Sequence, residues 1–131
     1  MSQTHILLAD DNPGILEHVA SLLAPDYEVV GRLPDGESVL REYDALQPDI
    51  VVLDISMGRL SGIDVARRLR DTGRPAKIIF LTVHEDQDFV SAAVGAGGSA
   101  YVVKSRMGAD LMSAIRAVLG GELFVSAPLR D

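Results

Sequence analysis

The sequence contains no cysteine and no tryptophan, and only 5% of its residues are aromatic. The absence of cysteine excludes disulfide bonds, thiolate metal sites and a cysteine nucleophile. The longest clearly apolar runs, residues 50–53 and 78–81, are far too short to cross a bilayer. The first residues, Met1 to His5, lack the charged and apolar regions of a signal peptide. We therefore expect a cytoplasmic protein that makes no contact with a membrane.

Basic residues are also scarce relative to acidic ones, and the net charge is −7. An acidic domain is repelled by the phosphate backbone of nucleic acids, so we expect no direct contact with DNA or RNA. The 131 residues suit one domain, and a hydrophobic content of 47% is enough to build a core.

Five short apolar segments alternate with five segments that have helical periodicity. The run at 50–53 is apolar throughout and rich in β-branched residues, which is typical of a strand buried on both faces of a parallel sheet. The pattern predicts an α/β domain with a five-stranded parallel sheet, doubly wound as (βα)5, in the flavodoxin-like strand order 2-1-3-4-5. The strands are expected at 5–9, 27–31, 50–53, 77–81 and 100–103.

The same pattern divides the chain into a domain at 1–121 and a remainder at 122–131. We expect this remainder to form no further β-α unit and to be a tail or the start of a linker. Two helix starts are also indicated. Asn12 is suited to cap a helix with Pro13 at its first position, and Ser61 followed by Asp64 resembles a capping box.

Polar residues stand where four of the five strands end. They are Asp10 and Asp11 after the first strand, Asp54 after the third, Thr82 at the end of the fourth and Lys104 after the fifth. In a parallel sheet these ends lie along one edge, so the side chains are expected to converge. Clustered carboxylates require a cation, and oxygen ligands favour Mg²⁺. A carboxylate nucleophile beside a metal, a lysine and a hydroxyl can receive a phosphoryl group.

Taken singly, each of these residues also has an ordinary structural interpretation. Adjacent acids favour a helix start, a lone threonine is usually structural, and a lone lysine is usually solvated. The three histidines, at 5, 18 and 84, show no spacing typical of metal ligands. Only the joint placement of the five residues favours the functional interpretation.

Residues 5–121 resemble a response-regulator receiver domain of two-component signalling. The motifs that carry the resemblance are Leu8-Ala9-Asp10-Asp11-Asn12-Pro13, Pro48 to Met57, Leu81-Thr82 and Tyr101-Val102-Val103-Lys104. The resemblance implies that the phosphohistidine of a sensor histidine kinase phosphorylates Asp54. It implies a domain that assists its own phosphotransfer and dephosphorylation and is otherwise no enzyme.

The resemblance also implies a ligand set for Mg²⁺. Asp11, Asp54 and the backbone carbonyl of Ser56 would contact the ion, and Asp10 would act through a water molecule.

Two further residues would hold the phosphoryl oxygens in this family, Thr82 and Lys104. Thr82 and Tyr101 would form a switch pair, in which the hydroxyl turns toward the phosphoryl group and the ring moves inward. The surface that changes would consist of the fourth helix, the fifth strand and the fifth helix.

Within the family, the sequence is most similar to the NarL or LuxR class, which carries a helix-turn-helix output domain. The similar segments are 27–31, 114–122 and 124–126. This similarity implies control of transcription and a possible phosphorylation-dependent homodimer. No output domain follows in these 131 residues, so the alternative is a stand-alone receiver that acts through protein contacts.

Three positions depart from the family pattern. Gly58 replaces a usual proline, Val83 replaces a small residue after Thr82, and Ala100 replaces a common glycine. A β-branched residue at 83 is expected to narrow access to Asp54 and to slow both entry and loss of the phosphoryl group.

Three other functions compete with this one. A metal-dependent aspartyl-phosphate phosphatase usually has a second aspartate two residues after the nucleophile, and this chain has Ser56 there. A flavin-binding module would need a phosphate loop after the first strand, where this chain has acidic residues. A pseudo-receiver that signals by contacts alone would not need the complete set of acids and lysine.

Overall fold

The structure is a computed structural model that describes residues 3–126, in which strands and helices alternate along the chain. The first half contains β1 (His5–Ala9), α1 (Pro13–Leu23), β2 (Glu28–Leu33), α2 (Gly36–Leu46) and β3 (Ile50–Leu53). The second half contains α3 (Gly62–Asp71), β4 (Lys77–Thr82), α4 (Gln87–Gly95), β5 (Ala100–Val103), the 3-10 turn η1 (Lys104–Arg106), α5 (Met107–Leu119) and β6 (Phe124–Val125). The alternation predicted from the sequence is confirmed.

The strands form one parallel sheet in the order β2-β1-β3-β4-β5-β6. The predicted order 2-1-3-4-5 is confirmed, and β1 lies beside β3 with Ala9 opposite Leu53. The structure adds one short element to the five predicted strands, because β6 pairs with β5 at the edge of the sheet. Two residues are too few to show the alternation by which a strand is recognised in a sequence.

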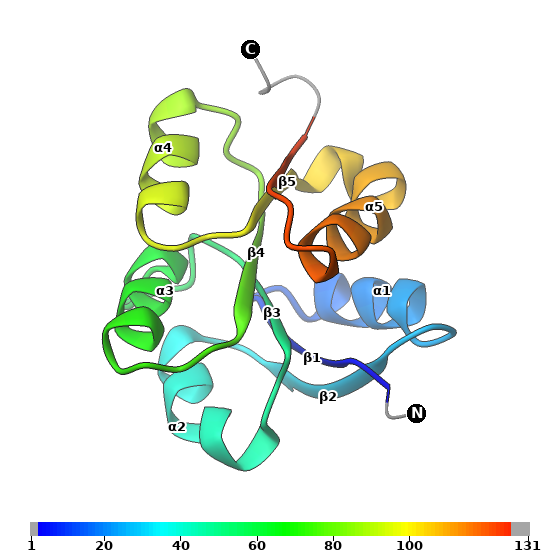
Figure 1. Ribbon diagram of the computed structural model, residues 1–131, viewed down its shortest axis with the longest axis horizontal. Helices are drawn as coiled ribbons and strands as arrows, with labels where there is room; N and C mark the ends of the chain where they lie inside the picture. The colour runs from blue at the N-terminus through cyan, green and yellow to red at the C-terminus, as the bar shows by residue number, and fades with distance from the viewer. Residues whose placement is uncertain (1–2, 127–131) are drawn as a thin grey trace.

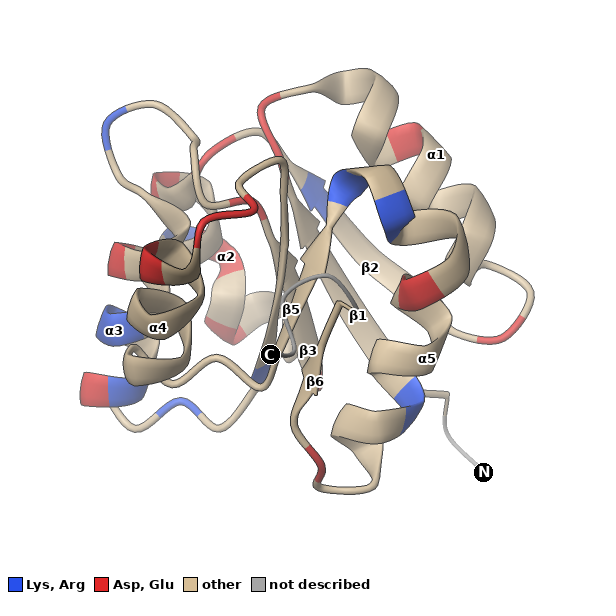
Figure 2. Cartoon of the chain, turned by 90° about the horizontal axis from the view of Figure 1, so that it is seen from above, with Lys and Arg blue, Asp and Glu red and all other residues tan. Residues whose placement is uncertain are grey.

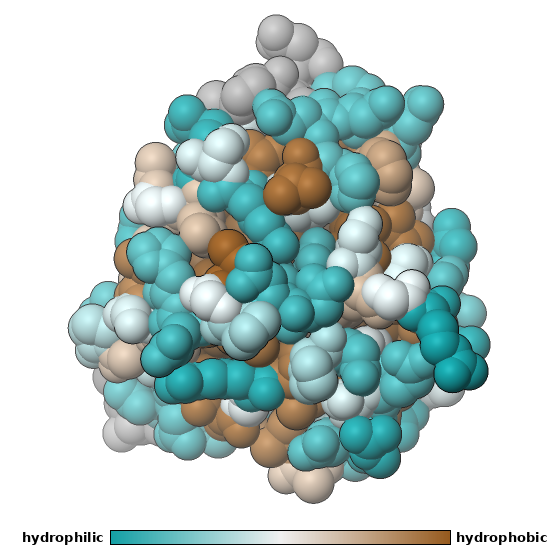
Figure 3. Space-filling view, turned by 180° about the vertical axis from the view of Figure 1, so that it is seen from behind, coloured by the Kyte–Doolittle hydropathy of each residue, from teal (hydrophilic) through white to brown (hydrophobic). Residues whose placement is uncertain are grey.

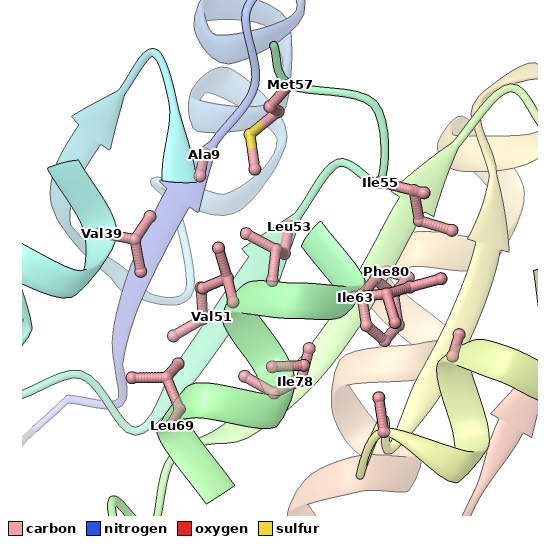
Figure 4. Close-up of a cluster of buried hydrophobic side chains, with 14 of the residues drawn as sticks. Ala9, Val39, Val51, Leu53, Ile55, Met57, Ile63, Leu69, Ile78 and Phe80 are labelled. Carbon is pink, nitrogen blue, oxygen red and sulfur yellow. The ribbon is translucent and has the colours of Figure 1, made fainter. Parts of the chain in front are cut away.

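Helices cover both faces of the sheet. Figure 1 shows α1 and α5 on one side and α2, α3 and α4 on the other. Each side has its own hydrophobic cluster, since neighbouring residues of a strand point to opposite faces. In the cluster beneath α2, α3 and α4, side chains of β1, β3 and β4 interdigitate with the facing helices (Figure 4). The all-buried strand β3 thus runs between two cores.

Local sequence signals place the helix starts. The side chain of Asn12 accepts hydrogen bonds from the backbone N–H of Gly14 and Ile15, at 2.9 and 3.3 Å, and Pro13 is the first helical residue. The Ser61 hydroxyl accepts from the N–H of Asp64 at 3.1 Å. Both predicted caps are therefore confirmed, and each helix begins directly after a loop at the carboxyl edge of the sheet.

The face of the molecule seen in Figure 3 is largely hydrophilic. Figure 3 shows the face opposite to that of Figure 1, where hydrophobic residues form small separate patches among polar ones. Between residues 3 and 126, no helix combines the length and the apolar character needed to cross a membrane.

Candidate functional site

The sheet ladder positions the two buried carboxylates of the site. The N–H of Asp10 donates to the carbonyl of Leu33 at 3.1 Å, and the N–H of Asp54 donates to the carbonyl of Ala9 at 3.0 Å. Because β1 and β3 are neighbours in register, the residues that follow them leave the sheet side by side. Two acids that are far apart in the sequence thereby reach the same edge.

Asp10, Asp11 and Asp54 converge there as predicted. Each offers one carboxylate oxygen, and the three oxygens lie within 4.8 Å of one another. Asp10 and Asp54 are only 3% and 5% exposed, whereas Asp11 is exposed. The Oδ2 atom of Asp10 is buried, and the group that lies against it is the ammonium of Lys104. A cluster that offers only oxygen ligands, one of them on a carboxylate exposed to water, suits a hard cation such as Mg²⁺.

Lys104 supplies the positive charge next to these acids. It is the first residue of η1, directly after β5, and its Nζ lies 2.7 Å from Oδ2 of Asp10 and 3.4 Å from Oδ2 of Asp54. Figure 2 shows basic bands where the chain enters α5 and acidic bands on the loops between the helical layers. Burial alone would lower the pKa of Lys104, but the hydrogen bond to Asp10 and the charges of Asp54 and Asp10 outweigh it and raise that pKa. The ammonium is thus fixed as a cation.

One lysine does not neutralise the cluster. The pKa of Asp54 is raised above its ordinary value, first because burial disfavours the charged carboxylate and second because Asp10 repels it. Lys104 and the N–H of Ser56, which donates to Oδ1 of Asp54 at 3.3 Å, oppose this shift without cancelling it. The site therefore holds more negative charge than the protein alone compensates.

Thr82 and Tyr101 are both fully buried near the end of the sheet. Thr82 closes β4, and its Oγ1 accepts from the N–H of His84 at 3.3 Å. The Tyr101 ring lies within the core, and its hydroxyl donates to the carbonyl of His84 at 2.8 Å. Burial, and then the charge of Asp86, raises the pKa of Tyr101 to about 12, so the phenol stays a donor. The ring is buried in this structure, and the role of Thr82 and Tyr101 as a switch pair stays a prediction.

His84 is the residue that sequence reasoning underrated. Its Nε2 lies 2.8 Å from the Ser56 hydroxyl, and its ring stacks on Phe89 with centroids 4.1 Å apart. It thus connects the loop after β3, the loop after β4 and the first turn of α4. The only sequence signal was its position two residues beyond Thr82. The proposed role of the Ser56 carbonyl as a metal ligand stays a prediction.

The departure at Gly58 has a backbone cause. Its φ of +73° lies in the left-handed region, and an added Cβ would meet no atom within 4 Å. Proline cannot adopt this conformation, because its ring holds φ near −65°. The loop after Asp54 therefore follows a path that the usual family residue could not.

Val83 is 66% exposed and stands between the buried Thr82 and the loop residue His84. We expect Val83→Ala to raise both the rate of phosphoryl uptake and the rate of phosphoryl loss by about two- to fivefold, since a modest barrier of under 1 kcal/mol is removed. Phosphorylation time courses with acetyl phosphate measure the first rate, and decay after its removal measures the second. Val94→Ala, on a half-exposed position of α4, is the matched control. Equal rates in wild type and Val83→Ala would contradict the expectation.

Gly62 brings the start of α3 against the Asp54 backbone. Its N–H donates to the carbonyl of Ile55 at 2.8 Å, and a Cβ at this position would overlap the Asp54 carbonyl group. The absence of a side chain at residue 62 thus permits the tight return of the loop that carries Asp54.

Comparisons with known proteins agree with this site. Residues 6–116 match the response regulator receiver domain family. The chain is 31% identical over 126 residues to the nitrate/nitrite response regulator protein NarL of Escherichia coli K12, covering 95% of this chain and 58% of NarL. It is 38% identical over 117 residues to the transcriptional regulatory protein CseB of Streptomyces coelicolor, covering 89% of this chain and 50% of CseB.

A solved structure extends the likeness to three dimensions. The crystal structure of a LuxR-family two-component response regulator from Aurantimonas sp. SI85-9A1 is 35% identical, with a TM-score of 0.92, and the match covers 98% of this chain and 93% of that one. The chain spans about half the length of the curated relatives named above. The family match, the fold and the acidic cluster agree, and the chain belongs to the response-regulator receiver domain family.

Proposed function

We propose that Asp54 is the phosphoacceptor of a two-component signalling switch and takes its phosphoryl group from the phosphohistidine of a sensor histidine kinase. The observation that supports this most directly is the meeting of Asp54 with Asp10, Asp11 and Lys104 at one edge of the sheet. A carboxylate oxygen of Asp54 forms a bond to phosphorus as the P–N bond of the phosphohistidine breaks. The imidazole leaves with the electron pair of that bond.

Mg²⁺ is the cofactor that this proposal requires. Asp11, Asp54 and the Ser56 carbonyl would hold the ion, and Asp10 would act through a water molecule. Bound there, the ion would supply charge that neutralises the phosphoryl oxygens. Lys104, which already lies 3.4 Å from Asp54, would pair with a second phosphoryl oxygen, and Thr82 would donate its hydroxyl to a third.

The output of the switch is proposed to be the surface of α4, β5 and α5. A phosphoryl group that attracts Thr82 would fix the loop that carries His84, to which Tyr101 is already hydrogen-bonded. Such a change needs only about 1–3 kcal/mol of coupling to alter the affinity for a partner. By analogy with NarL and CseB, we propose that the whole protein regulates transcription in the cytoplasm, with a phosphorylation-dependent homodimer as its active form. This domain would itself make no contact with nucleic acid.

The chemistry of the site favours this switch over the alternatives. A phosphatase needs an acid or base at position 56, where Ser56 is instead engaged with His84. A flavin phosphate would be repelled by Asp10 and Asp11 in the loop after β1. A pseudo-receiver would have no use for the assembled acids and lysine.

Labelling by acetyl phosphate tests the proposal. The protein incubated with acetyl phosphate and Mg²⁺ should gain one phosphoryl group, located by peptide mass spectrometry on the segment that contains Asp54. Addition of EDTA should abolish the gain. Labelling of a different residue, or equal labelling with EDTA, would exclude the proposed mechanism.

Mg²⁺ should stabilise the folded domain in a pH-dependent way. The folded-state pKa of Asp54 is raised, so this group contributes stability that is present below its unfolded pKa of about 3.9 and is lost as pH rises through the folded value. Mg²⁺ offsets that loss, and at ten times its Kd it should contribute about 1.4 kcal/mol. Thermal melts with and without Mg²⁺ should show a larger gain at pH 7 than near pH 4. A gain independent of pH would place the ion elsewhere.

A further inference from the structure

The short strand β6 attaches to the part of β5 that leads into the site. The N–H of Phe124 donates to the carbonyl of Ser99 at 3.2 Å, and the N–H of Ser126 donates to the carbonyl of Tyr101 at 2.9 Å. Side chains of β6 pack on both sides of the sheet. Phe124 lies against the cluster beneath α1 and α5, and Val125 lies against the cluster that contains Tyr101. Residues 124–126 are called the strap below.

The side chain of Ser126 makes the last hydrogen bond between the strap and β5. It is fully buried, and its Oγ accepts a hydrogen bond from the N–H of Val103 at 3.1 Å. In a longer parallel strand the backbone carbonyl of residue 126 would occupy this place in the ladder. The hydroxyl therefore satisfies the last N–H of β5, which immediately precedes Lys104.

The two β5 residues that hold the strap are also connected to the proposed site. Val103 is covalently joined to Lys104, whose ammonium contacts Asp10 and Asp54. The backbone carbonyl of Tyr101 accepts a hydrogen bond from the N–H of Ser126, and the Tyr101 hydroxyl donates a hydrogen bond to the carbonyl of His84. A two-residue strand at the edge of a sheet lies at the low end of local stability, so small changes at these residues can shift its attachment.

We propose that the strap responds to the state of the site. Its attachment to β5 becomes tighter when the site is occupied, and the Ser126 hydroxyl is the group that connects the strap to the end of β5. This regulation rests on the proposed phosphorylation of Asp54. An anion held at Asp54 and Lys104 would draw in Thr82 and fix the loop around His84. That loop holds the Tyr101 ring inward, where it supports Val125 and presents its carbonyl to Ser126. The state of the site would thereby reach the chain that follows residue 126.

Amide hydrogen exchange measured by NMR tests the strap. With Mg²⁺ and beryllofluoride, a mimic of the acyl phosphate, the amides of Val103, Phe124 and Ser126 should exchange at least threefold more slowly than without beryllofluoride. The amide of Glu28, which donates to the carbonyl of Thr4 at the opposite end of the other outer strand, should not respond. Faster or unchanged exchange of the three amides, together with a normal beryllofluoride-induced rise in melting temperature, would overturn the strap alone.

Substitution of Ser126 identifies the connecting group. In Ser126→Ala, the amides of Val103 and Phe124 should exchange about three- to tenfold faster, and beryllofluoride should no longer slow them while still raising the melting temperature. Ser113→Ala, which removes a hydroxyl from an outer position of α5, should behave as wild type. If Ser126→Ala kept the wild-type response, the hydroxyl would not be the connection. If no protein showed a thermal response to beryllofluoride, the proposed phosphorylation itself would fail.

Discussion

Asp54→Asn is expected to take up no phosphoryl group from acetyl phosphate in the presence of Mg²⁺. The amide nitrogen cannot attack phosphorus without losing its resonance, and the neutral amide oxygen is a much weaker nucleophile than a carboxylate, so the nucleophile is gone. The side chain keeps the shape of aspartate and can still accept from the N–H of Ser56, so the loop should stay in place. Intact-protein mass spectrometry after a fixed incubation measures the loss.

The same variant should be more stable than wild type without metal. Removal of one charge from a buried acidic cluster should raise the free energy of unfolding at pH 7 by about 1–2 kcal/mol, or the melting temperature by roughly 3–8 °C in a domain of this size. Most of the stabilisation by Mg²⁺ should disappear. Asp26→Asn, at an exposed carboxylate outside the site, should match wild type in labelling and in the response to Mg²⁺. Labelled Asp54→Asn protein would show that another residue accepts the phosphoryl group.

Gly62→Ala should severely destabilise the domain, by about 3 kcal/mol or more. The new Cβ would overlap the Asp54 carbonyl, and the atoms it meets belong to the backbone of residues 54 and 55, which cannot rotate away. Overpacking that displaces backbone lies at the costly end of core substitutions. Urea or thermal unfolding followed by circular dichroism measures the loss.

Gly108→Ala is the matched control for that substitution. It lies in α5, and an added Cβ there would meet no atom within 4 Å. Alanine favours a helix over glycine by roughly 1 kcal/mol, so this variant should be as stable as wild type or more stable. Similar behaviour of the two variants would contradict the role assigned to the close approach at Gly62.

The sequence was sufficient for the fold and the acidic cluster because both follow from regular rules. Apolar runs such as 50–53 mark parallel strands, and the ends of parallel strands share an edge, so Asp10 and Asp54 had to be neighbours. The contact between Lys104 and both acids followed from the same rule.

What the sequence could not predict depends on side-chain direction and on very short elements. The pairing of His84 with Ser56 depends on how two loops bend, and no periodicity encodes it. β6 has only two residues, and the buried hydroxyl of Ser126 substitutes for a backbone group that no strand pattern would reveal. The close approach at Gly62 is likewise visible only once α3 is placed against residue 54.

The order of the sheet also bears on how the protein resists aggregation. An open strand edge can pair with the edge of another molecule, and proteins limit this hazard with short outer strands and outward charges. One outer strand here, β6, is only two residues long, and the other, β2, carries the charged residues Glu28 and Arg32. Loss of the contact with β6 would expose the edge of the apolar strand β5. A variant in which β6 detaches should therefore be more prone to self-association at high concentration.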